Sequence, residues 1–156
     1  MSEDYKVKEN AHKIGAVLYI LWGGLHIYFG VWMLYALYTE GAAAVIAIVG
    51  SGVPASTLPV SLDPVTAATI GQHAWNILWF GFFAVVVGAL LNWKNSLAGY
   101  WANLVVVSAA DSGFVVAILL PGYIAISDGI EGPLLWIPAV IFSTIGILNR
   151  KSAQEI

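Results

Sequence analysis

The sequence predicts an all-α fold, an integral membrane bundle of four antiparallel helices, and three observations lead to this class. The chain of 156 residues is 60% hydrophobic and only 10% charged, whereas soluble domains are roughly a quarter charged. Its mean hydropathy is +0.84. Four stretches are apolar over the length of about 20 residues that a membrane helix needs. We therefore expect a single membrane domain over residues 1–156.

Each expected span has a recognisable boundary. The first carries no charged residue, and the second follows Asp63 and Pro64, which suit a helix cap and a first helical turn. The third stops near Pro121, where the ring ends a helix, and the fourth, which is the shortest, stops before Arg150. The expected spans are residues 14–38, 65–93, 96–120 and 133–149.

The connection after the first span, residues 39–63, is expected to be partly helical. It contains an apolar run, Ala42–Val49, that is too short to cross a bilayer. Glycines and prolines follow this run and break any helix. A short helix that lies in the interface or re-enters the bundle fits this pattern, and a structureless loop is the alternative.

The basic residues predict the orientation, because positive charge collects on the cytoplasmic side of membrane proteins. With four spans, one side carries every basic residue of the chain: Lys6, Lys8, Lys13, Lys94, Arg150 and Lys151. The opposite side carries only acidic ones, namely Glu40, Asp63, Asp128 and Glu131. We expect a multi-pass protein of the cell membrane with both termini in the cytoplasm.

Small residues recur at spacings that let membrane helices approach closely. The pairs are Gly23 and Gly30 in the first span, Ala84 and Gly88 in the second, and Ala109 and Gly113 in the third. Together they predict tight helix contacts.

Composition restricts the classes of function. Six Lys and Arg against nine Asp and Glu leave no basic patch, so a nucleic-acid partner is not expected. The chain has no cysteine, and this excludes a thiolate nucleophile and Cys-ligated metal centres.

Three ionisable residues lie inside the expected spans, one in each of the first three: His26, His73 and Asp111. Ionisable groups in hydrocarbon are costly and normally face a bundle interior or water. At about 1.5 Å per residue, the three lie within about one helical turn of the same depth. We expect them to form one polar pocket as candidate catalytic groups.

Polar and aromatic neighbours extend this expected pocket. Two amides flank His73, a hydroxyl lies one turn before Asp111, and tryptophans supply apolar walls. The expected ligand-binding residues are Trp22, Gln72, Asn76, Trp79 and Ser108.

Several functions could use such a pocket. In the first, His26, His73 and Asp111 bind a lipid-soluble small molecule and convert it by acid–base chemistry. In the second, His26 and His73 are axial ligands of a haem, or form a metal site with Asp111. In the third, the protein is an accessory subunit of a larger membrane complex, or a homo-oligomer. Structural pairing without chemistry is the remaining reading, and the sequence leaves the cofactor unknown.

Short motifs give a family resemblance. Gly23-Gly24-Leu25-His26 with Gly30 opens the first span, Trp79-Phe80-Gly81 lies in the second, and Leu119-Leu120-Pro121 ends the third. In organisation the chain resembles small four-span DoxX-like bacterial membrane proteins. The resemblance implies the four-helix fold and a bacterial or archaeal membrane, but no activity and no catalytic residue.

Overall fold

A computed structural model describes the backbone of residues 3–154 and the side chains of residues 10–150. Within these residues the chain is helical, with turns and no strand. The long helices are α1 (Glu3–Thr39), α3 (Pro64–Leu90), α4 (Leu97–Phe114) and α6 (Glu131–Gln154). All four are long and apolar enough to cross a membrane, which agrees with the four long apolar helices expected from the sequence.

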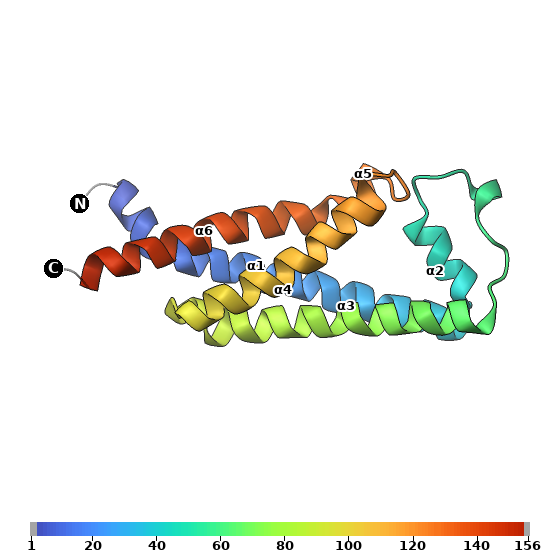
Figure 1. Cartoon of the computed structure of the whole chain (residues 1–156), viewed down its shortest axis with the longest axis horizontal. Coiled ribbons are helices and arrows are strands. Elements are labelled where there is room, and N and C mark those ends of the chain that lie inside the picture. Colours follow the sequence, from blue (N-terminus) through green and yellow to red (C-terminus); the bar gives the residue numbers. More distant parts are fainter. Residues whose placement is uncertain (1–2, 155–156) are drawn as a thin grey trace.

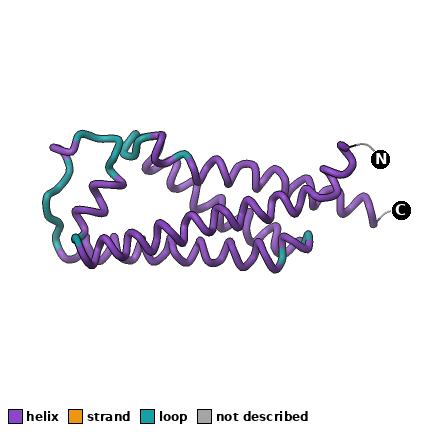
Figure 2. Tube along the Cα trace, turned by 180° about the vertical axis from the view of Figure 1, so that it is seen from behind, coloured by secondary structure: helices purple, strands orange, loops and turns teal. Residues whose placement is uncertain are grey.

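The long helices lie beside one another, with α1 in contact with both α3 and α6 along much of its length (Figures 1 and 2). Helix α4 contacts α3 and α6 and crosses them obliquely. A short helix, α2 (Ala42–Val49), covers one end of α1, and its bounds confirm the short helix expected there. A second short helix, α5 (Ile126–Gly129), precedes α6 and was not expected.

Local chemistry explains several helix boundaries. The Asp63 carboxylate accepts hydrogen bonds from the backbone N–H groups of Val65 and Thr66 at 2.9 and 3.0 Å, which confirms the cap of α3. A 3-10 turn, η2 (Asn92–Lys94), links α3 to α4 through Asn95, which has a φ of 54°. Asparagine tolerates this left-handed conformation better than most residues do.

Several helix bounds differ from the expectation: α1 begins at Glu3 rather than at residue 14, and α3 ends at Leu90 rather than at residue 93. Helix α4 continues as a π-helix, η3 (Val115–Leu119), before Pro121 ends it. Helix α6 begins at Glu131 rather than at Pro133, and it contains Pro138 in its interior. Pro138 has no N–H for the carbonyl one turn earlier, so the helix continues there with one hydrogen bond fewer.

Glycines let α1 and α3 come into backbone contact, as two of the three small-residue pairs predicted. A Cβ placed on Gly23 would lie 2.5 Å from the Gly81 carbonyl oxygen, and one on Gly30 would lie 2.7 Å from the Leu78 nitrogen. A Cβ on Gly88 would lie 3.0 Å from the Ile20 side chain and 3.3 Å from the Ala16 carbonyl oxygen, so α1 and α3 are also close there. The prediction was wrong for Ala109 and Gly113, which are both exposed, because α4 presents the opposite side to its neighbours.

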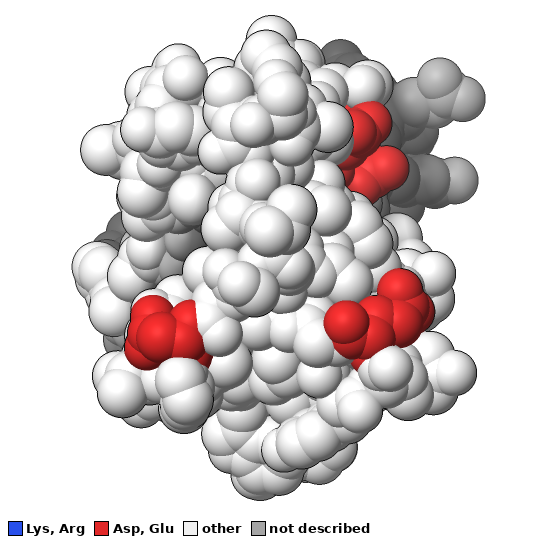
Figure 3. All heavy atoms as spheres, turned by 90° about the vertical axis from the view of Figure 1, so that its right-hand side faces the viewer, with Lys and Arg blue, Asp and Glu red and all other residues white. Residues whose placement is uncertain are grey.

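The two ends of the helix assembly differ in charge. At one end lie the start of α1, the end of α6 and the turn between α3 and α4 (Figure 1). There the Arg150 side chain donates to the Asn95 carbonyl oxygen at 2.9 Å. At the other end the loop after α2 contacts the loop after η3, since Gly52 donates to the Tyr123 carbonyl oxygen at 3.0 Å. Figure 3 looks onto this second end, where acidic side chains are visible and no basic one is.

Candidate functional site

A partly open cavity of about 620 Å³ lies between α1, α3 and α4 and is covered by α2. All three ionisable residues expected in the pocket, His26, His73 and Asp111, line it. Most other lining side chains are apolar and come from several helices, among them Phe29, Met33, Ile70, Phe114 and Ile118. The cavity therefore combines an apolar wall with a few titratable groups, which is typical of small-molecule sites.

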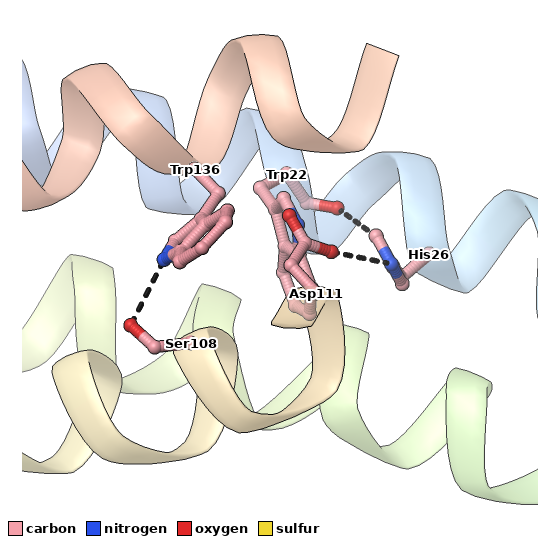
Figure 4. A network of polar contacts seen from close by, with 5 residues as sticks. All are labelled: Trp22, His26, Ser108, Asp111 and Trp136. Atoms are coloured by element: carbon pink, nitrogen blue, oxygen red, sulfur yellow. Dashed lines mark hydrogen bonds and ion pairs between the residues drawn. The ribbon is translucent and has the colours of Figure 1, made fainter. Parts of the chain in front are cut away.

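Trp22 holds the Asp111 carboxylate in place. The indole Nε1–H donates to Asp111 Oδ2 at 3.1 Å, and only 2% of Asp111 is exposed (Figure 4). Trp22 itself is fully buried in a core cluster with Tyr19, Val107 and other apolar residues. The buried Trp22 indole thus fixes the position of the Asp111 carboxylate, and Asp111 still borders the cavity.

His26 faces the other oxygen of the same carboxylate. Its Nδ1 is 2.9 Å from the Trp22 carbonyl oxygen, and because a carbonyl only accepts, Nδ1 carries the hydrogen. The imidazole also stacks on the Trp22 indole, with ring centroids 3.6 Å apart. These two contacts orient Nε2 toward Asp111 Oδ1 at 3.9 Å (Figure 4).

The separation of Nε2 and Oδ1 determines what this pair can do. At 3.9 Å the two atoms are too far apart for a direct hydrogen bond. In the neutral ring Nε2 is an acceptor, because Nδ1 holds the proton. A polar atom of a ligand that approaches both groups can donate to Nε2 or Oδ1, and a proton can pass to either group. The pair is therefore equipped for polar recognition and for acid–base transfer.

The start of α6 brings backbone against this pair. A Cβ on Gly132 would lie 3.4 Å from Asp111 Oδ1 and 3.7 Å from His26 Cε1, at ordinary van der Waals distance. The lack of a side chain at position 132 therefore leaves space directly above the carboxylate.

His73 lines the cavity from α3 but makes no hydrogen bond with another residue that the structure describes. Among the described side chains no group of three His, Cys, Asp or Glu residues is arranged to hold a metal ion. The geometry thus does not support a metal site formed by His26, His73 and Asp111.

None of the five expected ligand-binding residues lines the cavity. Gln72, Asn76 and Trp79 are exposed on α3 and do not line it. Helix α3 turns Ala74 and Gly81 toward its neighbours. At about 100° per residue, the expected ligand-binding positions face roughly the opposite side. The expectation that these three side chains face the pocket was therefore wrong, because the rotation of α3 about its axis turns them away from the cavity.

Ser108 also has a different role from the expected one. Its hydroxyl accepts a hydrogen bond from Trp136 Nε1 at 2.9 Å, so it joins α4 to α6 (Figure 4). Trp22 contributes as the support of Asp111 and His26 rather than as a wall.

Sequence reasoning missed several cavity residues. The apolar side of α2, including Val45 and Val49, closes the cavity opposite the polar pair, and Phe114 and Gly132 border it from α4 and α6. The apolar run of residues 42–49 was the available signal, because a short apolar helix that does not span the membrane is expected to pack against the long helices. Nothing in the sequence marked Gly132.

Acidic residues stand at the mouth of the cavity. Asp128 and Glu131 line it together with Ser127, and both carboxylates are exposed. The Ser127 hydroxyl donates to Asp128 at 2.8 Å and, with the Ser51 hydroxyl, lowers the pKa of that carboxyl. None of the described lining residues is a lysine or arginine. The field at the mouth is therefore negative.

Comparisons with protein-family models, curated proteins and solved structures find no match to this chain. The likeness to DoxX-like proteins stays a prediction from the sequence.

Proposed function

We propose that this chain is an integral protein of the cell membrane, an antiparallel four-helix bundle with both termini in the cytoplasm. Its long helices expose large apolar side chains on their outer faces, among them Val31, Val105, Val116 and Ile141, each at least half exposed. Soluble monomers rarely expose contiguous apolar surface of this extent. The basic residues of α6 and of the α3–α4 turn lie at the end where α1 begins, as the positive-inside rule requires.

The proposed function is to bind a small lipid-soluble molecule in the cavity, with its polar group against His26 and Asp111. The observation that carries this proposal is a cavity of about 620 Å³ whose mostly apolar walls lead to one fixed, nearly buried carboxylate. A carboxylate in an apolar site is costly, and Trp22 supplies only one of the hydrogen bonds that it can accept. A ligand that fills the space between Gly132 and the Asp111 carboxylate would supply others.

Acid–base conversion of this ligand is the chemical extension of the proposal. His26 Nε2 and Asp111 Oδ1 face the same space, so either can accept a proton from one atom of a bound molecule and return it to another. His73 lines the same cavity from α3 and could exchange protons with a more distant atom of the ligand. Trp22 would then be a positioning residue.

Blocking the space above Asp111 tests the binding proposal. We expect an organic extract of the purified protein to contain a bound small molecule by mass spectrometry, and Gly132→Leu to remove it. Gly132→Ala adds only a methyl group at van der Waals distance and serves as the folding control. Gly113→Leu, on the exposed side of α4 where nothing lies within 4 Å, is the matched control and should keep the molecule. Equal retention by a folded Gly132→Leu variant would contradict the proposal.

A second function, as a subunit of a larger membrane complex or as a homo-oligomer, is favoured by a different observation. Gln72 and Asn76 are exposed on the α3 span, one turn apart and beside the exposed Trp75. Amides that face hydrocarbon without partners are costly, and a neighbouring helix can satisfy them. Under this proposal the protein copurifies with a fixed partner or with itself at constant stoichiometry, and Gln72→Leu with Asn76→Leu breaks the association. A monomer in mild detergent and in native membranes would refute it.

A further inference from the structure

The cavity indicates which charge its ligand carries, and this inference rests on the proposed binding function. Every residue with a fixed charge that lines the cavity is acidic: Asp111 at the inner end, and Asp128 and Glu131 at the mouth. The remaining titratable groups are His26 and His73, which are neutral in their unprotonated forms. With neutral imidazoles the site has an excess of negative charge.

We propose that the cavity selects a lipophilic cation, a molecule with an ammonium-type head on an apolar body. The head would lie in the space between Gly132 and Asp111, against Asp111 Oδ1, which has no hydrogen-bond partner at 3.5 Å or less among the described residues. The apolar body would extend between Phe29, Phe114 and the inner side of α2.

The structure disfavours the other two charge types. An anionic head would stand beside the nearly buried carboxylate of Asp111 and would have to pass the mouth acids, and no lysine or arginine lines the cavity to offset this repulsion. A neutral head could bond to His26 Nε2, but it would leave the Asp111 charge without a counter-ion, which is costly in an apolar site. A cation offsets this charge directly, because its head lies against the nearly buried carboxylate.

The two acids at the mouth act differently from Asp111. They are exposed, so their attraction for a cation is screened by salt and mainly concentrates the ligand at the entrance. Asp111 is 2% exposed, and its contact is screened much less. Neutralising the mouth should therefore cause a smaller and more salt-dependent loss of affinity than neutralising Asp111.

Three probes of equal chain length test the charge preference: decyltrimethylammonium, decanol and decanoate. The full chain in phosphatidylcholine nanodiscs is titrated with each, and binding to empty nanodiscs is subtracted. We expect saturable binding of the ammonium probe at least about tenfold tighter than that of the other two, the ratio that one charged contact typically gives. Asp111→Asn keeps an oxygen for the Trp22 N–H and should reduce this ratio to about threefold or less. Glu40→Gln, an acid of the same end that does not line the cavity, should leave it unchanged.

The outcomes separate the charge preference from the binding function. Tighter binding of decanol or decanoate, blocked by Gly132→Leu, would overturn the charge preference and leave ligand binding in place. An ammonium preference that survives Asp111→Asn would overturn the role of Asp111. Should no probe saturate, the selection of a lipophilic cation is wrong, while the extract of the purified protein still tests binding separately. If Asp111→Asn does not fold, the double change Asp128→Asn and Glu131→Gln must lower the preference at low salt, and an unchanged preference overturns the proposal.

Discussion

The hydrogen bond from Trp22 to Asp111 gives a prediction whose size can be worked out from the structure. Trp22→Phe removes the Nε1–H that donates to Oδ2 at 3.1 Å. A hydrogen bond to an ionised acceptor contributes about 1.5–3 kcal/mol, against about 0.5–1.5 kcal/mol for one between neutral groups. The same substitution also removes packing, because Trp22 is fully buried. The charge contribution must therefore be separated from the packing loss.

A double-mutant cycle makes this separation. Asp111→Asn keeps the shape and the acceptor oxygen but removes the charge, so the packing loss of Trp22→Phe is the same in both backgrounds. We expect Trp22→Phe to lower the free energy of unfolding by about 1–1.5 kcal/mol more in the wild-type background than in the Asp111→Asn background, the difference between a charged and a neutral hydrogen bond. Reversible unfolding by dodecyl sulfate in mild detergent measures all four proteins.

Trp136→Phe supplies the control for this cycle. Its Nε1–H donates to the neutral Ser108 hydroxyl at 2.9 Å, on a neighbouring part of α4. Its cost should be the same with and without the Asp111→Asn substitution. If Trp22→Phe also costs the same in both backgrounds, Asp111 carries no charge that Trp22 stabilises, and the argument for a charged cavity end is refuted.

Two further predictions concern the fold. Gly81→Ala should destabilise the protein by about 1–3 kcal/mol, because the new methyl group meets the Gly23 carbonyl oxygen of α1, whereas Gly24→Ala, with nothing within 4 Å, should cost nothing by the same unfolding assay. The second concerns Asp63, whose pKa is lowered from 3.8 by the Thr66 hydroxyl and the backbone N–H groups of α3. The ionised Asp63 carboxylate therefore contributes its full stabilisation above pH 3.8 and loses it as the pH falls through the lower pKa of the folded state. In acid unfolding curves, the stability of Asp63→Asn should decrease less below pH 3.8 than that of the wild type. Identical curves would contradict the cap.

The sequence was sufficient to predict the long helices and α2, because the signals for a helix lie within the helix itself and at its ends. Span lengths follow from apolar runs, and the cap at Asp63 follows from the chemistry of one side chain and two backbone N–H groups. The apolar run of residues 42–49 had the length of a short helix and proved to be one. Gly23 and Gly30 marked the face of α1 that α3 approaches, since only small residues permit backbone contact there.

The candidate site was predictable only in part, because a shared depth does not fix the rotation of a helix. His26 and Asp111 meet, as their cost in an apolar environment suggested. Which face of α3 borders the cavity depends on which of its small residues pack against α1. In the observed packing, Gln72 and Asn76 face outward. The contribution of Gly132 depends on where α6 begins, which the two prolines of that segment obscured.

Photoaffinity labelling tests the central claim, that the cavity is a ligand site ending at His26 and Asp111, most directly. A decylammonium probe with a diazirine next to its head is activated in nanodiscs, and the labelled residues are located by peptide mass spectrometry. We expect labels on the cavity side of α1 and α4, near His26 and Phe114, that unlabelled decyltrimethylammonium displaces. Labels spread over the exposed face of α3, near Trp75 and Trp79, and not displaced by the competitor, would contradict it.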